Sequence, residues 1–215
     1  MFFVGKIAAK SQIDTSMVSR LSLFKTVYVT GAPASGKSST MAKLKKRVPD
    51  LNVWEYGARL TEFLRMRGTE LKDQDELRSQ SARIVTPSDI DALDGKLLEW
   101  VEETRSSGPV VIDSHPVTKE DYGFRVTAFS GDGFRRLGPD EIWLFYVAPE
   151  VTCRRILKDA AGRPTITLEE ARIHSAAQAS VACTFGIAAG CPVYMFDTDV
   201  DQADLVDQLA SRLGR

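Results

Sequence analysis

Apolar residues along the chain fall into two patterns: short continuous or alternating runs, and longer stretches in which they recur every three or four positions. The short runs are typical of buried strands, and the longer spacing is typical of amphipathic helices. The strands predicted in this way cover residues 26–30, 51–56, 109–113, 141–147 and 192–196. Since these strands alternate with helices, we predict an α/β fold, a three-layer sandwich around a five-stranded parallel sheet.

Several predicted helices begin at recognisable capping sequences. Asp73 with Glu76, and Thr167 with Glu170, have the spacing of a capping box, and Thr86 precedes a proline suited to a first helical turn. The predicted helices cover about residues 36–47, 57–67, 73–84, 87–105, 150–158, 167–185 and 201–213. Residues 114–138 are polar and rich in glycine, so we expect an irregular segment there, on the substrate side of the sheet.

The length of 215 residues suits one domain with a substantial core. Residues 1–24 carry no strong pattern and are interpreted as an N-terminal extension. Residues 25–215 are predicted to form the domain, with a short lid near 159–166.

Composition narrows the class of partner. The net charge of −1 provides no global basic field, so we expect no nucleic acid partner and predict a small-molecule partner instead. No stretch approaches the length that spans a bilayer, so no membrane partner is expected. The three cysteines are an odd number without metal-ligand spacing, which fits a reducing cytoplasm. The oligomeric state stays open.

The first predicted strand runs directly into G-x-x-x-x-G-K-S, the sequence form of a phosphate-binding loop that opens a helix. Gly31 and Gly36 allow tight turns that bring backbone N–H groups close to phosphate oxygens. Lys37 supplies a mobile positive charge, and the Ser38 hydroxyl is suited to ligate Mg²⁺. We therefore expect ATP and Mg²⁺ as cofactors, with Ala34, Ser35 and Ser39 completing the nucleotide-binding loop.

Other candidate residues carry charge near the ends of predicted strands. Asp113 ends a wholly apolar strand, where it either orients Mg²⁺ beside Ser38 or caps the following turn. His115 either faces the acceptor or is a hydrogen-bonded loop residue. Arginines suit phosphoryl transfer because their planar guanidinium groups bind phosphate through two N–H donors, although a single arginine is more often a solvated surface group. The candidates are Arg59, Arg78, Arg154, Arg155 and Arg163.

Together these residues resemble nucleoside monophosphate kinases, in particular the archaeal-type adenylate kinases. The similarity runs from about Thr26 to the C-terminal helix, and its motifs are residues 31–38, 55–57, 73–78, 111–115 and 154–155. The resemblance implies a fold of the P-loop kinase type with Gly57, Arg59 and His115 near the acceptor. It also implies that Arg78 binds the acceptor phosphate, that Asp113 supports Mg²⁺, and that the arginines around the lid close over the phosphoryl groups.

The leading hypothesis is Mg²⁺-dependent phosphoryl transfer from ATP to a nucleoside monophosphate, with AMP as the first candidate. One alternative is a P-loop kinase for a hydroxyl acceptor such as a nucleoside or sugar, in which Asp113 acts as the base. Another is a non-enzymatic ATP-gated binding protein. Arg78 distinguishes these hypotheses, since only an acceptor that carries phosphate requires it.

Overall fold

The computed structural model describes residues 24–214 apart from 74–75, 78–82, 128 and 159–164. Its main sheet has five parallel strands in the order β2-β3-β1-β6-β7. The strands are β1 (Thr26–Gly31), β2 (Asn52–Glu55), β3 (Val110–Asp113), β6 (Glu141–Tyr146) and β7 (Val193–Asp197). This sheet confirms the predicted α/β fold and all five predicted strands.

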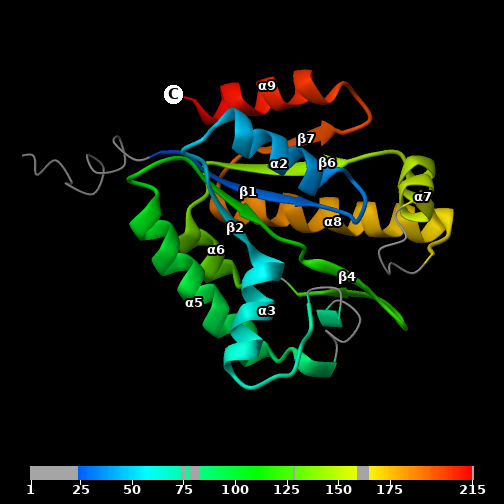
Figure 1. Ribbon diagram of the computed structural model, residues 1–215, viewed down its shortest axis with the longest axis horizontal. Coiled ribbons are helices and arrows are strands. Elements are labelled where there is room, and N and C mark those ends of the chain that lie inside the picture. The colour runs from blue at the N-terminus through cyan, green and yellow to red at the C-terminus, as the bar shows by residue number, and fades with distance from the viewer. Residues whose placement is uncertain (1–23, 74–75, 78–82, 128, 159–164, 215) are drawn as a thin grey trace, which may run out of the picture.

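Helices cover both faces of the sheet (Figure 1). They are α2 (Lys37–Arg47), α3 (Tyr56–Met66), α5 (Pro87–Thr104), α6 (Gly131–Leu137), α7 (Pro149–Lys158), α8 (Leu168–Ala189) and α9 (Gln202–Leu213). Side chains alternate between the faces along each strand. In β1, Val27 and Val29 therefore pack against α2 and α9, whereas Tyr28 packs against α3, α5, α6 and α8. These two apolar clusters make the three layers.

The caps expected from the sequence are present at two long helices. Thr86 and Asp89 form a capping box that starts α5, and Thr167 and Glu170 form one that starts α8. Helix α8 is longer than predicted and continues to Ala189, where Gly190 in a left-handed conformation ends it. None of the described helices combines the length and apolar character that a membrane crossing requires.

The prediction of an irregular segment over residues 114–138 is wrong. Strands β4 (Val117–Glu120) and β5 (Gly123–Val126) form an antiparallel hairpin, and α6 follows it. Gly123 permits the tight connection because its φ of 133° is a conformation that other residues rarely adopt. The Ser130 hydroxyl accepts a hydrogen bond from the N–H of Gly133 and so caps α6.

Three predicted segments fall largely outside the described residues. For the helix predicted over 73–84, the described part contains the Asp73 carboxylate, which accepts a hydrogen bond of 2.9 Å from the N–H of Glu76. The lid predicted near 159–166 is described only at residues 165 and 166, and the N-terminal extension only at residue 24.

A buried ionic cluster joins the sheet to the last helix. The Glu141 carboxylate on β6 accepts hydrogen bonds from Lys25 at 2.8 Å, Arg212 at 3.0 Å and the Trp143 indole at 2.7 Å. Burial alone would raise the pKa of Glu141, but these three donors lower it below its ordinary value. The cluster therefore favours an ionised Glu141 in the folded chain.

Candidate functional site

The phosphate loop, residues 31–38, connects β1 to α2 through two glycine positions that no other residue fits well. A Cβ on Gly31 would lie 2.5 Å from the carbonyl oxygen of Phe145 on the neighbouring strand. Gly36 has a φ of 82° and immediately precedes α2. The loop therefore directs the free N–H groups at the start of α2 toward the space outside the strand ends, an arrangement suited to bind phosphate.

Lys37 and Asp113 form an ion pair at the mouth of this loop. The Lys37 side chain is 3% exposed and the Asp113 side chain is 13% exposed. Asp113 reaches Lys37 because β3 lies beside β1, with Asp113 paired to Val29 in the register. The pair holds a mobile cation and a carboxylate next to each other where phosphates would bind.

Two side chains far away in the sequence support the loop from behind. The buried Thr198 hydroxyl donates a hydrogen bond of 2.6 Å to the carbonyl of Ser35. Arg155 of α7 donates to the carbonyls of Ala34 and Thr198, each at 3.2 Å. Arg155 and Thr198 therefore both hold the backbone of the phosphate loop in place. No sequence motif indicates this role for Thr198.

One cavity of about 1300 Å³ opens beside the phosphate loop. The loop and the start of α2 line one side of it, through Ala34, Ser35, Gly36, Lys37, Ser38 and Ser39. Helices α3 and α5 and the β4–β5 hairpin contribute other parts of the wall. The cavity therefore has room for more than one small molecule.

The predicted residues divide into those that reach this cavity and those that do not. Gly57, His115 and Arg155 line it, and the His115 ring donates to the carbonyl of Gly31 at 3.1 Å. Arg59 lies 5.1 Å over the Trp54 ring and pairs with Glu62 at 3.4 Å, away from the cavity lining. Arg154 is exposed on α7 and is also absent from the lining. Arg78 and Arg163 lie outside the described residues.

Two side chains in the cavity wall were not predicted. The Tyr56 hydroxyl, at the start of α3, donates a hydrogen bond of 2.6 Å to Asp94 of α5. Burial raises the pKa of Asp94 from its ordinary value of 3.8 to about 6. The sequence carries a signal for Asp94, because it occupies the apolar stripe of α5 between Ile90 and Leu97.

Helix α8 contacts both the β4–β5 hairpin and β1, the strand that leads into the phosphate loop. Glu170 pairs with Lys119 of β4 at 3.2 Å, His174 donates to the carbonyl of Val117 at 3.1 Å, and Gln178 donates to the Thr30 hydroxyl on β1. Burial lowers the pKa of His174, so its ring is neutral at pH 7 and donates through Nε2. One helix thus positions both the hairpin side and the phosphate side of the cavity.

The donors near the loop fit Mg²⁺. Ser38 offers an exposed hydroxyl into the cavity, and Asp113 offers a carboxylate at the adjacent strand end. Mg²⁺ prefers such oxygen ligands and usually completes its shell with waters and substrate phosphates. Accordingly, the described residues contain no cluster of three or more His, Cys, Asp or Glu that would bind a metal by itself.

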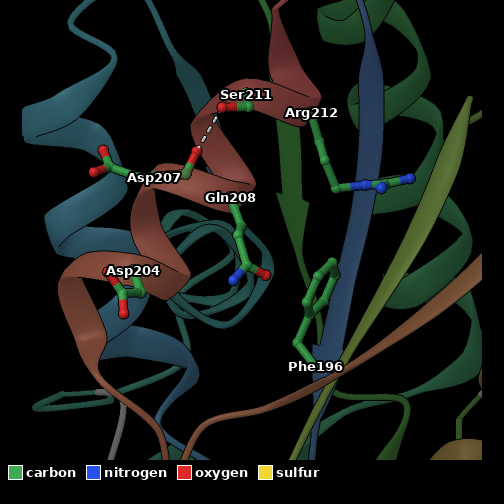
Figure 2. A pocket seen from close by; sticks show the side chains of 6 residues that line it. All are labelled: Phe196, Asp204, Asp207, Gln208, Ser211 and Arg212. Carbon is green, nitrogen blue, oxygen red and sulfur yellow. Dashed lines mark hydrogen bonds between the residues drawn. The ribbon is translucent and has the colours of Figure 1, made fainter.

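A second hollow, of about 540 Å³, lies between α9 and β7 (Figure 2). Figure 2 shows the hydrogen bond that the Ser211 hydroxyl donates to the backbone carbonyl of Asp207, while Arg212 and Phe196 lie toward the sheet. Arg212 is already held by Glu141 and by the Tyr194 ring, 3.5 Å away. None of the predicted site residues lines this hollow, so the first cavity is the candidate active site.

Comparison with known proteins gives one family and a structural relative. The family model AAA_17, described as an AAA domain, matches residues 30–172. No curated protein matches the sequence. A structure of deoxyadenosine kinase from M. mycoides, with dCMP and a flexible dCDP bound as products, aligns with a TM-score of 0.52 and 10% identity over 87% of this chain and 98% of that chain. At this identity the likeness shows the fold, an α/β fold of the P-loop kinase type.

Proposed function

We propose that this chain, which belongs to the AAA_17 family of AAA domains, is an ATP-dependent P-loop kinase. The group that it phosphorylates is a hydroxyl group of a nucleoside-like small molecule. One observation carries the proposal. The phosphate loop and Lys37, which is paired with Asp113, line the same cavity as a wall built by α3, α5 and the hairpin. A donor nucleotide and an acceptor then meet next to a carboxylate that is suited to take a proton.

In this mechanism the phosphates of ATP attract Lys37, and its ion pair with Asp113 weakens. Asp113 then accepts the proton of the acceptor hydroxyl as its oxygen attacks the γ-phosphorus. The bond between that phosphorus and the β–γ bridging oxygen breaks, and ADP leaves. Mg²⁺ held by Ser38 would neutralise charge on the phosphates, while Lys37 and the N–H groups of the loop stabilise the transition state.

The choice of a hydroxyl acceptor replaces the leading hypothesis of a monophosphate acceptor. That hypothesis relied on arginines at the acceptor, but Arg59 is directed away from the cavity. Two cations of the hairpin that do line it are paired with carboxylates, Lys119 with Glu170 and Arg125 with Glu120, each at 3.2 Å. The relative named above is a nucleoside kinase, which also favours a hydroxyl acceptor.

A monophosphate acceptor is the second candidate function. Arg83, Lys119 and Arg125 line the cavity and place positive charge on its acceptor side. An acceptor phosphate would compete with Glu120 and Glu170 for two of these cations. AMP, which the resemblance to archaeal-type adenylate kinases implies, remains the first monophosphate to try, and Arg78 remains a predicted binding residue for its phosphate.

The test is phosphoryl transfer from radiolabelled ATP with Mg²⁺ to a panel of nucleosides, their monophosphates, simple sugars and water. We expect at least one nucleoside to be phosphorylated far faster than ATP is hydrolysed. The Lys37→Ala variant should lose this transfer, whereas Lys46→Ala, an exposed lysine on the same helix, should keep it. Transfer only to monophosphates would establish the second candidate, and slow ATP hydrolysis with every acceptor would leave only an ATP-gated binding protein.

A further inference from the structure

Part of the cavity wall is apolar and is built from α3, α5 and the segments that precede α5 and α6. Five large side chains face the cavity here and belong to, or pack against, one cluster of the core: Leu60, Leu77, Val85, Ile90 and Phe129. An apolar wall that includes an aromatic ring suits a flat heteroaromatic group. The ring of a nucleoside-like acceptor would lie against it.

A single carboxylate, Asp94, interrupts this wall. It lines the cavity, is 9% exposed, and receives the hydrogen bond of 2.6 Å from the Tyr56 hydroxyl on Oδ1. Within the described part of the chain, no lysine or arginine forms an ion pair with it. Its second oxygen, Oδ2, still has lone pairs for a donor.

The charge on Asp94 has no structural use that a neutral residue would lack. Burying a carboxylate without a cation is costly, and an asparagine oxygen would accept the same hydrogen bond from Tyr56. At pH 7.5 the carboxyl is nonetheless ionised, because burial raises its pKa only to about 6. In that state it accepts hydrogen bonds and donates none. A carboxylate that is buried at such a cost in the wall of a cavity, and that can only accept hydrogen bonds, indicates a ligand that supplies N–H groups.

We propose that Asp94, held in place by Tyr56, is a specificity-determining residue that accepts a hydrogen bond from the amino group of the acceptor's nucleobase. The site then selects bases with an amino group, which are adenine, cytosine and guanine, over bases that present a carbonyl oxygen at the corresponding position. A carbonyl oxygen facing the carboxylate would be repelled and would leave it without a donor. This inference rests on the proposed function, since it assumes a nucleoside-like acceptor.

The experiment compares matched acceptors that differ by one amino-to-oxo exchange, adenosine with inosine and cytidine with uridine, at pH 7.5. We expect the wild type to prefer the amino member of a pair by about tenfold or more in kcat/KM, because a hydrogen bond to a buried charged group is lost with the oxo member. Asp94→Asn should reduce this preference below about threefold or reverse it. The change should appear mainly in the KM of the acceptor, with the KM of ATP unaffected.

The matched control is Glu99→Gln, the same change from carboxylate to amide on the exposed face of α5. It should leave the preference unchanged. Tyr56→Phe removes the donor that holds the carboxylate, so it should weaken the preference partly. These two variants separate recognition by Asp94 from a general effect of charge or folding.

The outcomes also separate this inference from the proposed function. If the wild type phosphorylates nucleosides but uses both members of each pair equally, or if Asp94→Asn keeps the wild-type preference, the inference is wrong and the proposed function stands. If the wild type uses only monophosphates, AMP with IMP and CMP with UMP form the same pairs and the same criteria hold. If it phosphorylates no nucleoside or nucleotide, both proposals fail.

Discussion

Replacing Asp94 with asparagine is expected to stabilise the folded protein at neutral pH and to change its stability little near pH 4. The pKa of Asp94 rises from 3.8 to about 6 in the folded chain, mainly because the carboxyl is buried. Between these two values the folded chain holds a proton that the unfolded chain has released. The free energy of unfolding therefore falls as the pH rises through this window, and the full penalty is present above pH 6.

The size of the penalty follows from the shift. A difference of about two pKa units corresponds to about 3 kcal/mol. The asparagine oxygen keeps the hydrogen bond from Tyr56, so the variant should recover most of this energy at pH 7.5. For a chain of this length, each kcal/mol raises Tm by about 2–4 °C.

The assay is urea unfolding of the wild type and of Asp94→Asn at several pH values between 4 and 8. The groups that face Asp94 are Tyr56, Tyr28 and Asp91. Burial raises the pKa of both tyrosines above the ordinary value, so neither titrates in this range. A gain that did not depend on pH, or a loss of stability at pH 7.5, would refute the argument that the Asp94 charge is buried at a cost. Glu99→Gln is again the control.

The other predictions concern the loop, the ionic cluster and the lid. Lys37→Ala should lower turnover by roughly 10²-fold or more with an unchanged circular dichroism spectrum, and near-normal turnover would contradict the assignment of a kinase. Gly36→Ala should raise the KM of ATP at least about tenfold, measured by initial rates, because its φ of 82° is strained for alanine; an unchanged KM would contradict this. Glu141→Gln should destabilise the folded protein by about 2–4 kcal/mol at pH 7, measured by urea unfolding. This loss of stability should become smaller as the pH falls below 4.5, since the pKa of Glu141 is lowered in the folded chain. A loss of stability that is constant down to pH 3 would contradict the role of the ionic cluster. Arg163→Ala should lower kcat more than it raises the KM of ATP, and equal effects would mean that Arg163 only binds nucleotide.

The main sheet was predictable because each of its strands is a short run of continuous or alternating apolar residues. The hairpin was missed because β4 and β5 are only partly buried and pair with each other instead of with the main sheet. Half of their eight residues are polar, so they resemble a loop. The available signal was the tight connection of Asp121 and Tyr122 before Gly123, between two segments of equal length.

The site divides in the same way between local and distant contacts. The phosphate loop is contiguous in the sequence, so its chemistry can be predicted from eight residues. The contact of Tyr56 with Asp94 joins positions 38 residues apart, and that of Arg155 with Thr198 joins positions 43 residues apart, so both depend on how helices pack against the sheet. The outward direction of Arg59 likewise follows from the phase of α3, in which the adjacent Leu60 is the buried residue.

The contacts of α8 limit which changes of length this chain tolerates. Glu170, His174 and Gln178 lie four residues apart, so they occupy one face of the helix over about 12 Å. A single residue inserted between His174 and Gln178 would rotate one part of this face by about 100° relative to the other. The hairpin and the strand before the phosphate loop would then lose their common support, even though no residue of the cavity had been replaced. Homologous chains with this arrangement should therefore vary in length at the hairpin connection and keep the length of α8 constant between these positions.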